Sequence, residues 1–436
     1  MIVAALLLAV AAPSRAERLV DLYKEALSSD PRAAAARYDL EASAKGVDQA
    51  RAALLPSIVF ESDTQRDRQR IRSSQNAIIA PGLSEFPVSA NTLTLNQPIF
   101  RLAAYERLLQ SRASVRQAAA LQLAADQGLI LRLAQAYLGV LAARDNLDLA
   151  QAEKKSLAGQ LELVEARLQR GLATLANVHE ARARHAQADA RQVDAQNLLQ
   201  DAEQGVQEIL SRRLKRALAL AEDIPLTVPD PANIGTWVEA AQARNLAVQG
   251  RRAAVEVASQ EIHRQRAGHF PTLNLIGQHV NRKQGGTLFG GGSHVETGSL
   301  ILRLQVPIFD GFGTRAVTEE AVARHEKAKQ ELEQELRQVE RQTRASYNGV
   351  VGAVTQVNAL RQAVRSQESA VAVKQESYRS GLLTVIAVLD AQRDLYFARR
   401  DYARARYDYL VNRLRLKQAA GTLAEEDLAQ IDRLLR

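Results

Sequence analysis

The sequence predicts an α+β fold built as a tandem repeat, in which each half combines a pair of β-strands with a very long helical hairpin. Three observations predict it. Several short motifs recur at one spacing, two runs in each half alternate polar and apolar residues, and alanine-rich stretches without proline follow those runs.

The recurring motifs indicate an internal duplication. The stretch RLQRGLATLANVHEARA around Gly171 parallels SYRSGLLTVIAVLDAQR around Gly381, and AQAYLGVL parallels RASYNGVV, both at an offset of 210 residues. The pattern Leu-x-Leu-x-x-Pro-Ile-Phe occurs at 93–100 and again at 302–309, and LLPSIVF parallels HFPTLNL. We therefore predict a first repeat over 17–215, a linker over 216–235, a second repeat over 236–420 and a C-terminal segment over 421–436.

Each repeat is expected to begin with a helix and continue into two strands. The helices are predicted at about 19–54 and 236–267, and the strands at 57–64, 88–97, 272–281 and 296–306. The last strand shows the period of two most clearly, because Leu300, Leu302 and Leu304 face one way while Arg303 and Gln305 face the other. Proline lacks the N–H that a strand ladder or a helix interior needs, so four prolines mark the predicted strand–helix junctions. These are Pro56, Pro98, Pro271 and Pro307.

Two very long helices are predicted where proline is absent, over 101–169 and 314–379. Apolar residues recur there at a three/four spacing that is typical of a coiled-coil seam. The seam residues are Leu147, Ala150, Leu157, Leu161, Val164 and Leu168 in the first copy and Val357, Leu360, Val364, Val371 and Tyr378 in the second. Gly171 and Gly381 are predicted to end these helices, with returning helices over about 176–214 and 385–420.

Composition argues against an enzyme and against thick globular cores. Aromatic residues make up 4% of the chain, and there is no cysteine, so disulfides and thiol nucleophiles are excluded. The histidines are scattered, and GTLFGGGSH lacks the end of a phosphate-binding loop. The net charge of +8 is dispersed, as on a solvated helical surface, with no basic run interleaved with aromatics. We expect no catalytic site, metal, cofactor or nucleic-acid partner.

The N-terminal stretch MIVAALLLAVAAPSRAER is interpreted as a secretory signal. Its apolar run from Ile2 to Ala12 is too short to span a bilayer as a helix, and small residues follow Pro13. We expect residues 1–16 to be removed after Ala16. No later apolar segment reaches about 18 residues, so the exported chain is expected to lack a transmembrane helix.

Four strands of this length are too few to close a barrel, which needs about eight. If they lie in a membrane, unpaired edges leave N–H and C=O groups in lipid at a cost of several kcal/mol each. The chain is therefore expected to oligomerise and to pool its strands into one barrel, from which the helical hairpins continue.

Over the whole exported chain the sequence resembles the TolC family of outer-membrane efflux and secretion channels. The resemblance rests on ERLVDLYKEALSSDPRAAAARYDL near the start, VLDAQRDLYFARRDYARARY and YDYLVNRLRLKQAAGTLAEEDL near the end, and the two glycine turns. It implies a homotrimer in the outer membrane with a twelve-stranded barrel, four strands per chain, above a periplasmic helical tunnel. The linker and the C-terminal segment then belong to its equatorial region.

The same resemblance implies an exit duct completed by a periplasmic adaptor (membrane fusion protein) and an inner-membrane transporter of ABC or RND type. A type I protein secretion role is favoured, and a multidrug efflux role with a proton-driven pump is the alternative. A soluble periplasmic coiled-coil scaffold is the rival from another class. Its weakness is that it explains neither the signal sequence nor the paired strands.

In the family an Asp-x-x-Asp pair after the second glycine turn narrows the periplasmic end. Here the second acid is present as Asp390, and Ala387 replaces the first. Three copies of Asp390 around a narrow axis would favour cations. An ordinary solvated aspartate on the helix surface is the alternative.

The family's closed state also uses links from a tyrosine and an arginine to polar partners after the first turn. Tyr378 matches the tyrosine, whereas Leu383 stands at the arginine position. The partner positions hold Ala176 and Asn177, so a Tyr378–Asn177 hydrogen bond is the one link that could survive.

The two turns resemble the family's adaptor-docking sites. They consist of Arg170, Gly171 and Leu172 in the first copy and Ser380, Gly381 and Leu382 in the second. The plainer interpretation is that these glycines only terminate helices.

Four arginines alternate in RDRQRIR, at positions 66, 68, 70 and 72. If the first strand extends through them, they share one face, at the extracellular mouth or against anionic lipopolysaccharide. A solvated loop is the alternative.

Overall fold

The computed structural model describes residues 17–73, 82–286 and 291–436. The predicted signal peptide, residues 1–16, lies outside the described residues. The chain divides into two compact units. The helical unit comprises the residues up to Tyr38 together with Ala120–Gln249 and Gln334–Arg436, and the sheet unit comprises Asp39–Ala119 and Gly250–Glu333.

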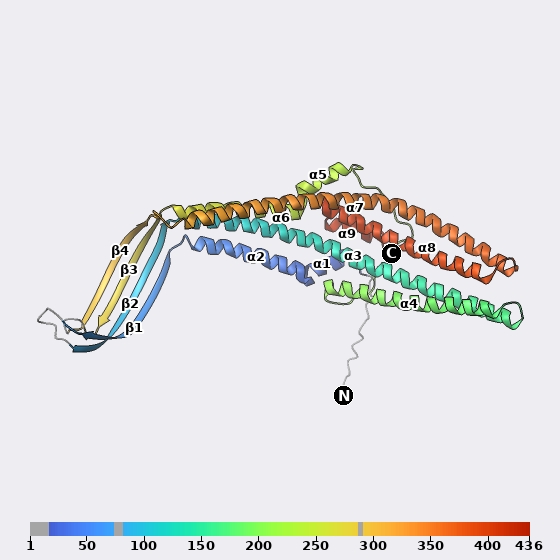
Figure 1. Cartoon of the computed structure of the whole chain (residues 1–436), viewed down its shortest axis with the longest axis horizontal. Coiled ribbons are helices and arrows are strands. Elements are labelled where there is room, and N and C mark those ends of the chain that lie inside the picture. The colour runs from blue at the N-terminus through green and yellow to red at the C-terminus, as the bar shows by residue number, and fades with distance from the viewer. Residues whose placement is uncertain (1–16, 74–81, 287–290) are drawn as a thin grey trace, which may run out of the picture. The chain divides into compact units, whose positions relative to one another are not determined.

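The sheet unit holds four antiparallel strands in the order β1-β2-β3-β4, drawn side by side in Figure 1. Their bounds are β1 Ser57–Ile71, β2 Gly82–Phe100, β3 Thr272–Gln284 and β4 Ser293–Gln305. All four strands were predicted, but β1 and β2 extend further toward each other than the alternation indicated. The segment Arg66–Ile71 is charged, so its strand character depends on pairing with Gly82–Pro87 across the hairpin rather than on an apolar period.

The register places apolar side chains on one face of all four strands. Ile58 is opposite Leu95, Leu95 is opposite Gly277, and Gly277 is opposite Leu300. Cross-strand neighbours share a face. We call this the apolar face, and its members are Ile58, Phe60, Leu93, Leu95, Leu273, Leu275, Leu300, Leu302 and Leu304. The other face is mostly polar and carries Glu61, Asp63, Thr92, Thr94, Asn274, Gln278, Arg303 and Gln305.

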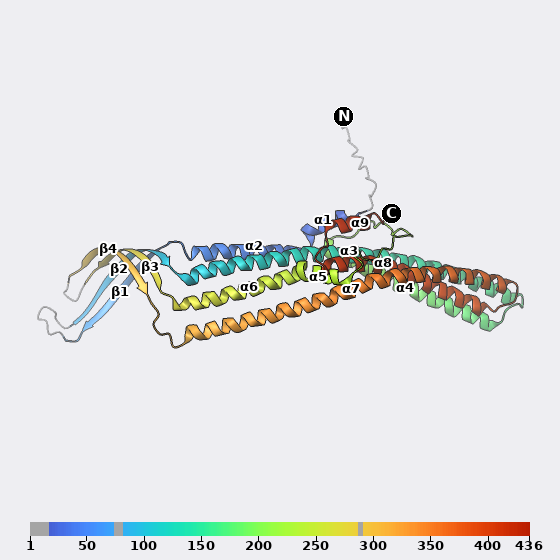
Figure 2. The ribbon, with the colours of Figure 1, turned by 90° about the horizontal axis from the view of Figure 1, so that it is seen from above.

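The long helices and their returning partners agree closely with the prediction. They are α3 Leu102–Gln169, α4 Leu175–Leu210, α7 Gly313–Arg379 and α8 Val385–Ala419. Figure 1 shows α3 with α4 and α7 with α8 as two hairpins, and Figure 2 shows the same helices from above. α3 has 68 residues and α7 has 67. α4 ends earlier than expected because Ser211 adopts a left-handed conformation (φ 58°) and its N–H donates to Gln207 O.

The predicted seam forms part of the core of the helical unit. Leu157 and Val164 of α3 are buried with Val178 and Ala181 of α4, and Tyr378 of α7 belongs to the same cluster. Leu161 and Leu168 pack against this cluster, while Leu147 packs with Ala150 in a neighbouring one. Small alanines on facing helices let the backbones approach closely, which explains a core built with few aromatic residues.

The prediction of one continuous helix at the start of each repeat was wrong. The first divides into α1 Leu19–Ser29 and α2 Pro31–Ala52, and the second into α5 Ile234–Arg244 and α6 Leu246–Arg266. A buried polar residue lies at each break and caps the following helix. Asp30 accepts a hydrogen bond from Ala33 N (2.9 Å), and Asn245 accepts one from Ala247 N (2.9 Å).

Asp30 is also held by Arg132 of α3 through two hydrogen bonds of 2.8 and 3.0 Å. Burial alone would raise the pKa of Asp30, but the hydrogen bonds from Arg132 and Ala33 outweigh it and hold the pKa below its ordinary value. The Asp30 carboxylate is therefore charged at neutral pH and fixes the entry of the chain against α3.

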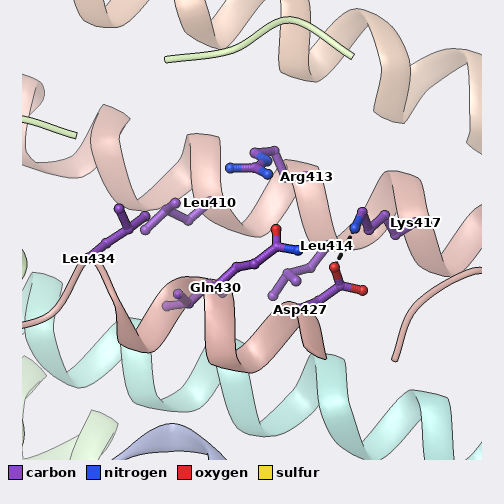
Figure 3. Close-up of a pocket in the computed structure, with 8 residues that line it drawn as sticks. Leu410, Arg413, Leu414, Lys417, Asp427, Gln430 and Leu434 are labelled. Carbon is purple, nitrogen blue, oxygen red and sulfur yellow. Dashed lines mark hydrogen bonds and ion pairs between the residues drawn. The ribbon is translucent and has the colours of Figure 1, made fainter. Parts of the chain in front are cut away.

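The end of the chain packs on the helical unit. Figure 3 shows Leu410 and Leu414 of α8 facing α9 (Glu425–Asp432), with Lys417 paired to Asp427. Beyond α9, Arg436 exchanges backbone hydrogen bonds with Ala219 at 2.8 and 3.0 Å. Among the residues that the structure describes, no helix is both long and apolar enough to cross a membrane.

Candidate functional site

Both long helices of the helical unit end in the same backbone turn. Gly171 (φ +74°) and Gly381 (φ +78°) adopt the left-handed conformation that ordinary residues avoid. The next N–H reaches back five residues in each copy, from Leu172 to Arg167 O and from Leu382 to Ser377 O, both at 2.8 Å. This is the Schellman arrangement, which satisfies carbonyls at a helix end.

The surface of each turn is apolar and open. Leu172 is 72% exposed and Leu382 is 79% exposed, and Arg170 and Ser380 beside them are also exposed. Nothing lies within 4 Å of a Cβ added at Gly171 or Gly381. The turns therefore present matching leucines that are largely exposed, as a docking surface requires.

Asp390 lies in the second turn of α8 and is paired across the hairpins. Its Oδ1 is 3.1 Å from Arg184 Nη2 of α4 and 3.5 Å from Arg393 Nη1 of its own helix. Arg184 also binds Glu180 at 2.9 Å. The carboxylate thus lies between two guanidinium groups, and the first and second hairpins are joined by an ion pair. Ala387, one helical turn before Asp390, is half-buried.

Tyr378 is buried at the end of α7, but Asn177 is not its partner. The Asn177 N–H donates to Thr174 Oγ1 (3.3 Å), and among the described residues no hydrogen bond joins Asn177 to Tyr378. Instead the Arg167 guanidinium lies 4.3 Å from the centre of the Tyr378 ring, and its Nη1 donates to Tyr378 O at 3.5 Å. A cation–π contact from α3 takes the place of the expected hydrogen bond.

The four junction prolines occupy three kinds of position. Pro56 follows α2 and precedes β1, and Pro271 directly precedes β3. Pro98 lies inside β2, where the register with β3 shifts between Pro98 and Phe100. Pro307 lies in the connection from β4 to α7. At Pro98 the strand accommodates the missing N–H through an irregularity rather than by ending.

Arg184 and Arg167 were missed by the sequence analysis. Each is one arginine among many on a long helix, and their partners lie 206 and 211 residues away. The repeat offset of 210 contains a partial signal for Arg184, since it matches this basic residue with the acidic Asp394, about one helical turn after Asp390. Opposite charges at equivalent positions of two packed copies indicate that an ion pair between the copies is available near Asp390.

Four strands with an apolar face, joined to helical hairpins that end in exposed turns, define a protomer of an outer-membrane channel. The model that describes the outer membrane efflux protein family matches residues 22–212 and 237–422. The chain belongs to this family. It is an efflux or secretion channel of the outer membrane that extends into the periplasm, and it is not an enzyme. Membership of this family also excludes the soluble scaffold.

Similarity to individual proteins covers nearly the whole chain. Outer membrane protein TolC of Vibrio cholerae is 29% identical over 96% of this chain and 93% of its own length. Alkaline protease secretion protein AprF of Pseudomonas aeruginosa is 29% identical over 94% of this chain and 85% of its own length.

Solved structures show the same fold. The outer membrane protein VceC of Vibrio cholerae superposes with a TM-score of 0.76 at 22% identity, covering 92% of this chain and 96% of VceC. The predicted fold class, long helical hairpins with a four-stranded contribution to a trimeric barrel, is that of these channels.

Proposed function

We propose that the chain forms a homotrimer that serves as the exit duct of a type I protein secretion system. We favour type I secretion over multidrug efflux because the chain is similar over nearly its full length to AprF, a protein named for alkaline protease secretion. A periplasmic adaptor and an inner-membrane ABC transporter complete the machine in this proposal.

The trimer is supported by the open edges of the sheet. In the described chain β1 pairs only with β2, and β4 pairs only with β3. Each edge strand has 13 or more residues, and its unpaired backbone groups need a partner strand within lipid. Three copies joined β4 to β1 give twelve strands and leave no edge.

The turns at Gly171 and Gly381 are the adaptor-docking sites in this proposal, and Asp390 with Ala387 belongs to the periplasmic constriction. A channel of this kind opens by a change in helix packing that adaptor binding favours. The pairs Arg184–Asp390 and Arg167–Tyr378, which join the two hairpins, are the contacts available to hold the closed packing.

Purification of the protein from its own cells, followed by identification of its partners, tests the proposal. We expect an ABC transporter and an adaptor to co-purify, and deletion of the protein to abolish release of a large protein into the medium. Recovery of a proton-driven pump, with loss of drug tolerance and unchanged secretion, would assign the channel to multidrug efflux instead.

A further inference from the structure

Strand β1 carries opposite charges on its two faces. Because successive strand residues point to opposite sides, Arg66, Arg68 and Arg70 share the side that carries Ile58 and Phe60. We call these three residues the arginine row, and all three are exposed. Arg72, the fourth arginine of the motif, follows the end of the strand.

The carboxylates of the same strand lie on the other side. Asp67 lies between Arg66 and Arg68 in the sequence and belongs to the polar face, as do Glu61 and Asp63 nearer the start of the strand. If both faces of the strand were equally solvated, no separation of its positive and negative side chains would be expected. The separation indicates that the two faces of β1 meet different surroundings at the level of the arginine row.

The arginine row continues the apolar face outward. Phe60 and Arg66 are six residues apart, which is about 20 Å along a strand and about 15 Å across a bilayer after a barrel tilt of about 40°. Ser62 and Thr64 lie between them on the same face. The long arginine side chains can lean back along the strand toward a headgroup layer.

Cross-strand neighbours leave most of this positive charge free for a ligand. Arg68 is paired with Glu85 of β2 at 3.0 Å. Arg66 is opposite Pro87 and Arg70 is opposite Leu83, neither of which is charged. Among the described residues, neither Arg66 nor Arg70 has an ion pair. Lys283 of β3, opposite Ser89, adds a further positive charge to the same face.

We propose that the arginine row binds the phosphate groups of anionic lipid in the outer leaflet of the membrane. Arginine is suited to this partner because its planar guanidinium can bind a phosphate through two hydrogen bonds. The row would fix the height of the barrel in the membrane and retain a shell of anionic lipid around it. The inference rests on the membrane setting of the sheet and not on which transporter the channel serves.

The test compares lipid retention by the full-length protein and by Arg66→Gln/Arg70→Gln, a variant that keeps the Arg68–Glu85 pair. Both are reconstituted into phosphatidylcholine nanodiscs containing a minor fraction of lipid A, and bound lipid A is counted by native mass spectrometry. A basic side chain near an anionic surface contributes about a fivefold change in binding, so the double variant should bind about 25-fold more weakly.

Two further variants keep the result interpretable. Arg66→Lys/Arg70→Lys retains the charge without the paired donors and should lose only part of the binding. Arg213→Gln/Arg404→Gln removes the same charge from two exposed arginines of the helical unit and should retain lipid A like the wild type. Equal retention by the wild type and Arg66→Gln/Arg70→Gln would overturn the inference, as would wild-type retention that is insensitive to salt.

Pore formation is measured in parallel to separate this inference from the proposed function. A variant that conducts normally and keeps its lipid A contradicts only the arginine row. A wild-type protein that forms no pore contradicts the proposed channel function. The comparison of lipid A retention between the wild type and Arg66→Gln/Arg70→Gln still decides whether the arginine row binds lipid.

Discussion

Arg184 of α4 and Asp390 of α8 form an ion pair of 3.1 Å between the two helical hairpins of one chain. Both side chains are partly exposed, at 22% and 37%, so the pair contributes about 1 kcal/mol or less to stability. The larger effect of this ion pair is electrostatic, since it places a positive charge beside Asp390. From the sequence alone, no basic partner was predicted for this aspartate.

Removal of Arg184 should therefore make the channel more selective for cations. In Arg184→Gln the Asp390 carboxylate keeps only Arg393, and in the proposed constriction three such carboxylates would attract cations more strongly. We expect a severalfold rise in the cation-to-anion permeability ratio, measured from reversal potentials in planar bilayers under a salt gradient. Asp390→Ala should shift the ratio in the opposite direction.

A matched control is Arg182→Gln, two residues away on α4. Arg182 pairs with Glu165 of α3 at 2.7 Å, inside the first hairpin, and its loss should leave selectivity close to that of the wild type. Identical reversal potentials for the wild type, Arg184→Gln and Asp390→Ala would remove the pair from the constriction.

The proposed adaptor-docking role of the turns predicts that substitution of their glycines weakens adaptor binding before it weakens trimer formation. Gly171→Ala and Gly381→Ala each place a Cβ in a left-handed conformation, at a cost of about 1–2 kcal/mol confined to the turn. Since nothing lies within 4 Å of either Cβ, trimers should still form. Adaptor capture by the purified trimer should weaken first. If trimer yield falls while the remaining trimers bind adaptor normally, the glycines serve only to end helices.

Acid should weaken the sheet unit through Glu261 of α6. Its carboxylate accepts hydrogen bonds from Arg264 (2.6 and 2.8 Å), Gln265 (2.6 Å) and Gln110 of α3 (2.8 Å). The Arg264 hydrogen bonds lower the pKa of Glu261 from 4.5 to about 2 despite partial burial. Because the folded pKa lies below the unfolded one, this stabilisation is complete above about pH 4.5 and is lost as the pH falls toward 2.

The variant Glu261→Gln should accordingly melt at a lower temperature than the wild type at neutral pH, and the two melting temperatures should converge toward pH 2. Thermal unfolding followed by circular dichroism across that range measures the difference. Glu256→Gln, which removes an exposed pair with Arg116 between the same two helices, should change the melting temperature little at any pH. A difference between the wild type and Glu261→Gln that does not vary with pH would contradict the assignment.

The duplicated motifs predicted the elements well because helix ends and strand alternation are local properties. Gly171 and Gly381 terminate the long helices where the sequence placed them, and Leu157 and Val164 lie in a buried seam. The helix break at Asp30 has a local cause, because Pro31 follows it, lacks an N–H and disfavours the helical conformation of the preceding residue. The break at Asn245 has no proline beside it and depends on a tertiary contact, since the Asn245 side chain donates to Ala419 O, 174 residues away.

The site was less predictable than the fold for the same reason. Asp390 could be found from its motif, but its partner Arg184 depends on how two hairpins pack together. Tyr378 likewise lies where the motif placed it, but its partner in the structure is Arg167 and not Asn177. In β1 the alternation of Arg66, Arg68 and Arg70 was visible, whereas their sharing a side with Ile58 required the strand to continue without a bulge.

Gly421 should be the glycine least tolerant of substitution among those with positive φ. Its φ is +69°, and an added Cβ would lie 2.3 Å from Arg244 O and 2.9 Å from Asn245 N, at the break between α5 and α6. Both are backbone atoms, so the clash is relieved only by moving the end of α8, which Asn245 also holds by donating to Ala419 O at 2.9 Å. Conformational strain of about 1–2 kcal/mol and overpacking of about 1–3 kcal/mol together predict a loss of about 3 kcal/mol for Gly421→Ala.

Gly381→Ala is the matched control, because it introduces the same left-handed strain at a position where the Cβ meets nothing within 4 Å. Urea unfolding midpoints of the two variants and the wild type separate the contributions, since the control reports strain alone. Gly421→Ala should unfold at a clearly lower urea concentration than Gly381→Ala. Equal midpoints would show that the chain end can move away from Arg244 at no cost, and that the contact between α8 and the α5–α6 break does not stabilise the helical unit.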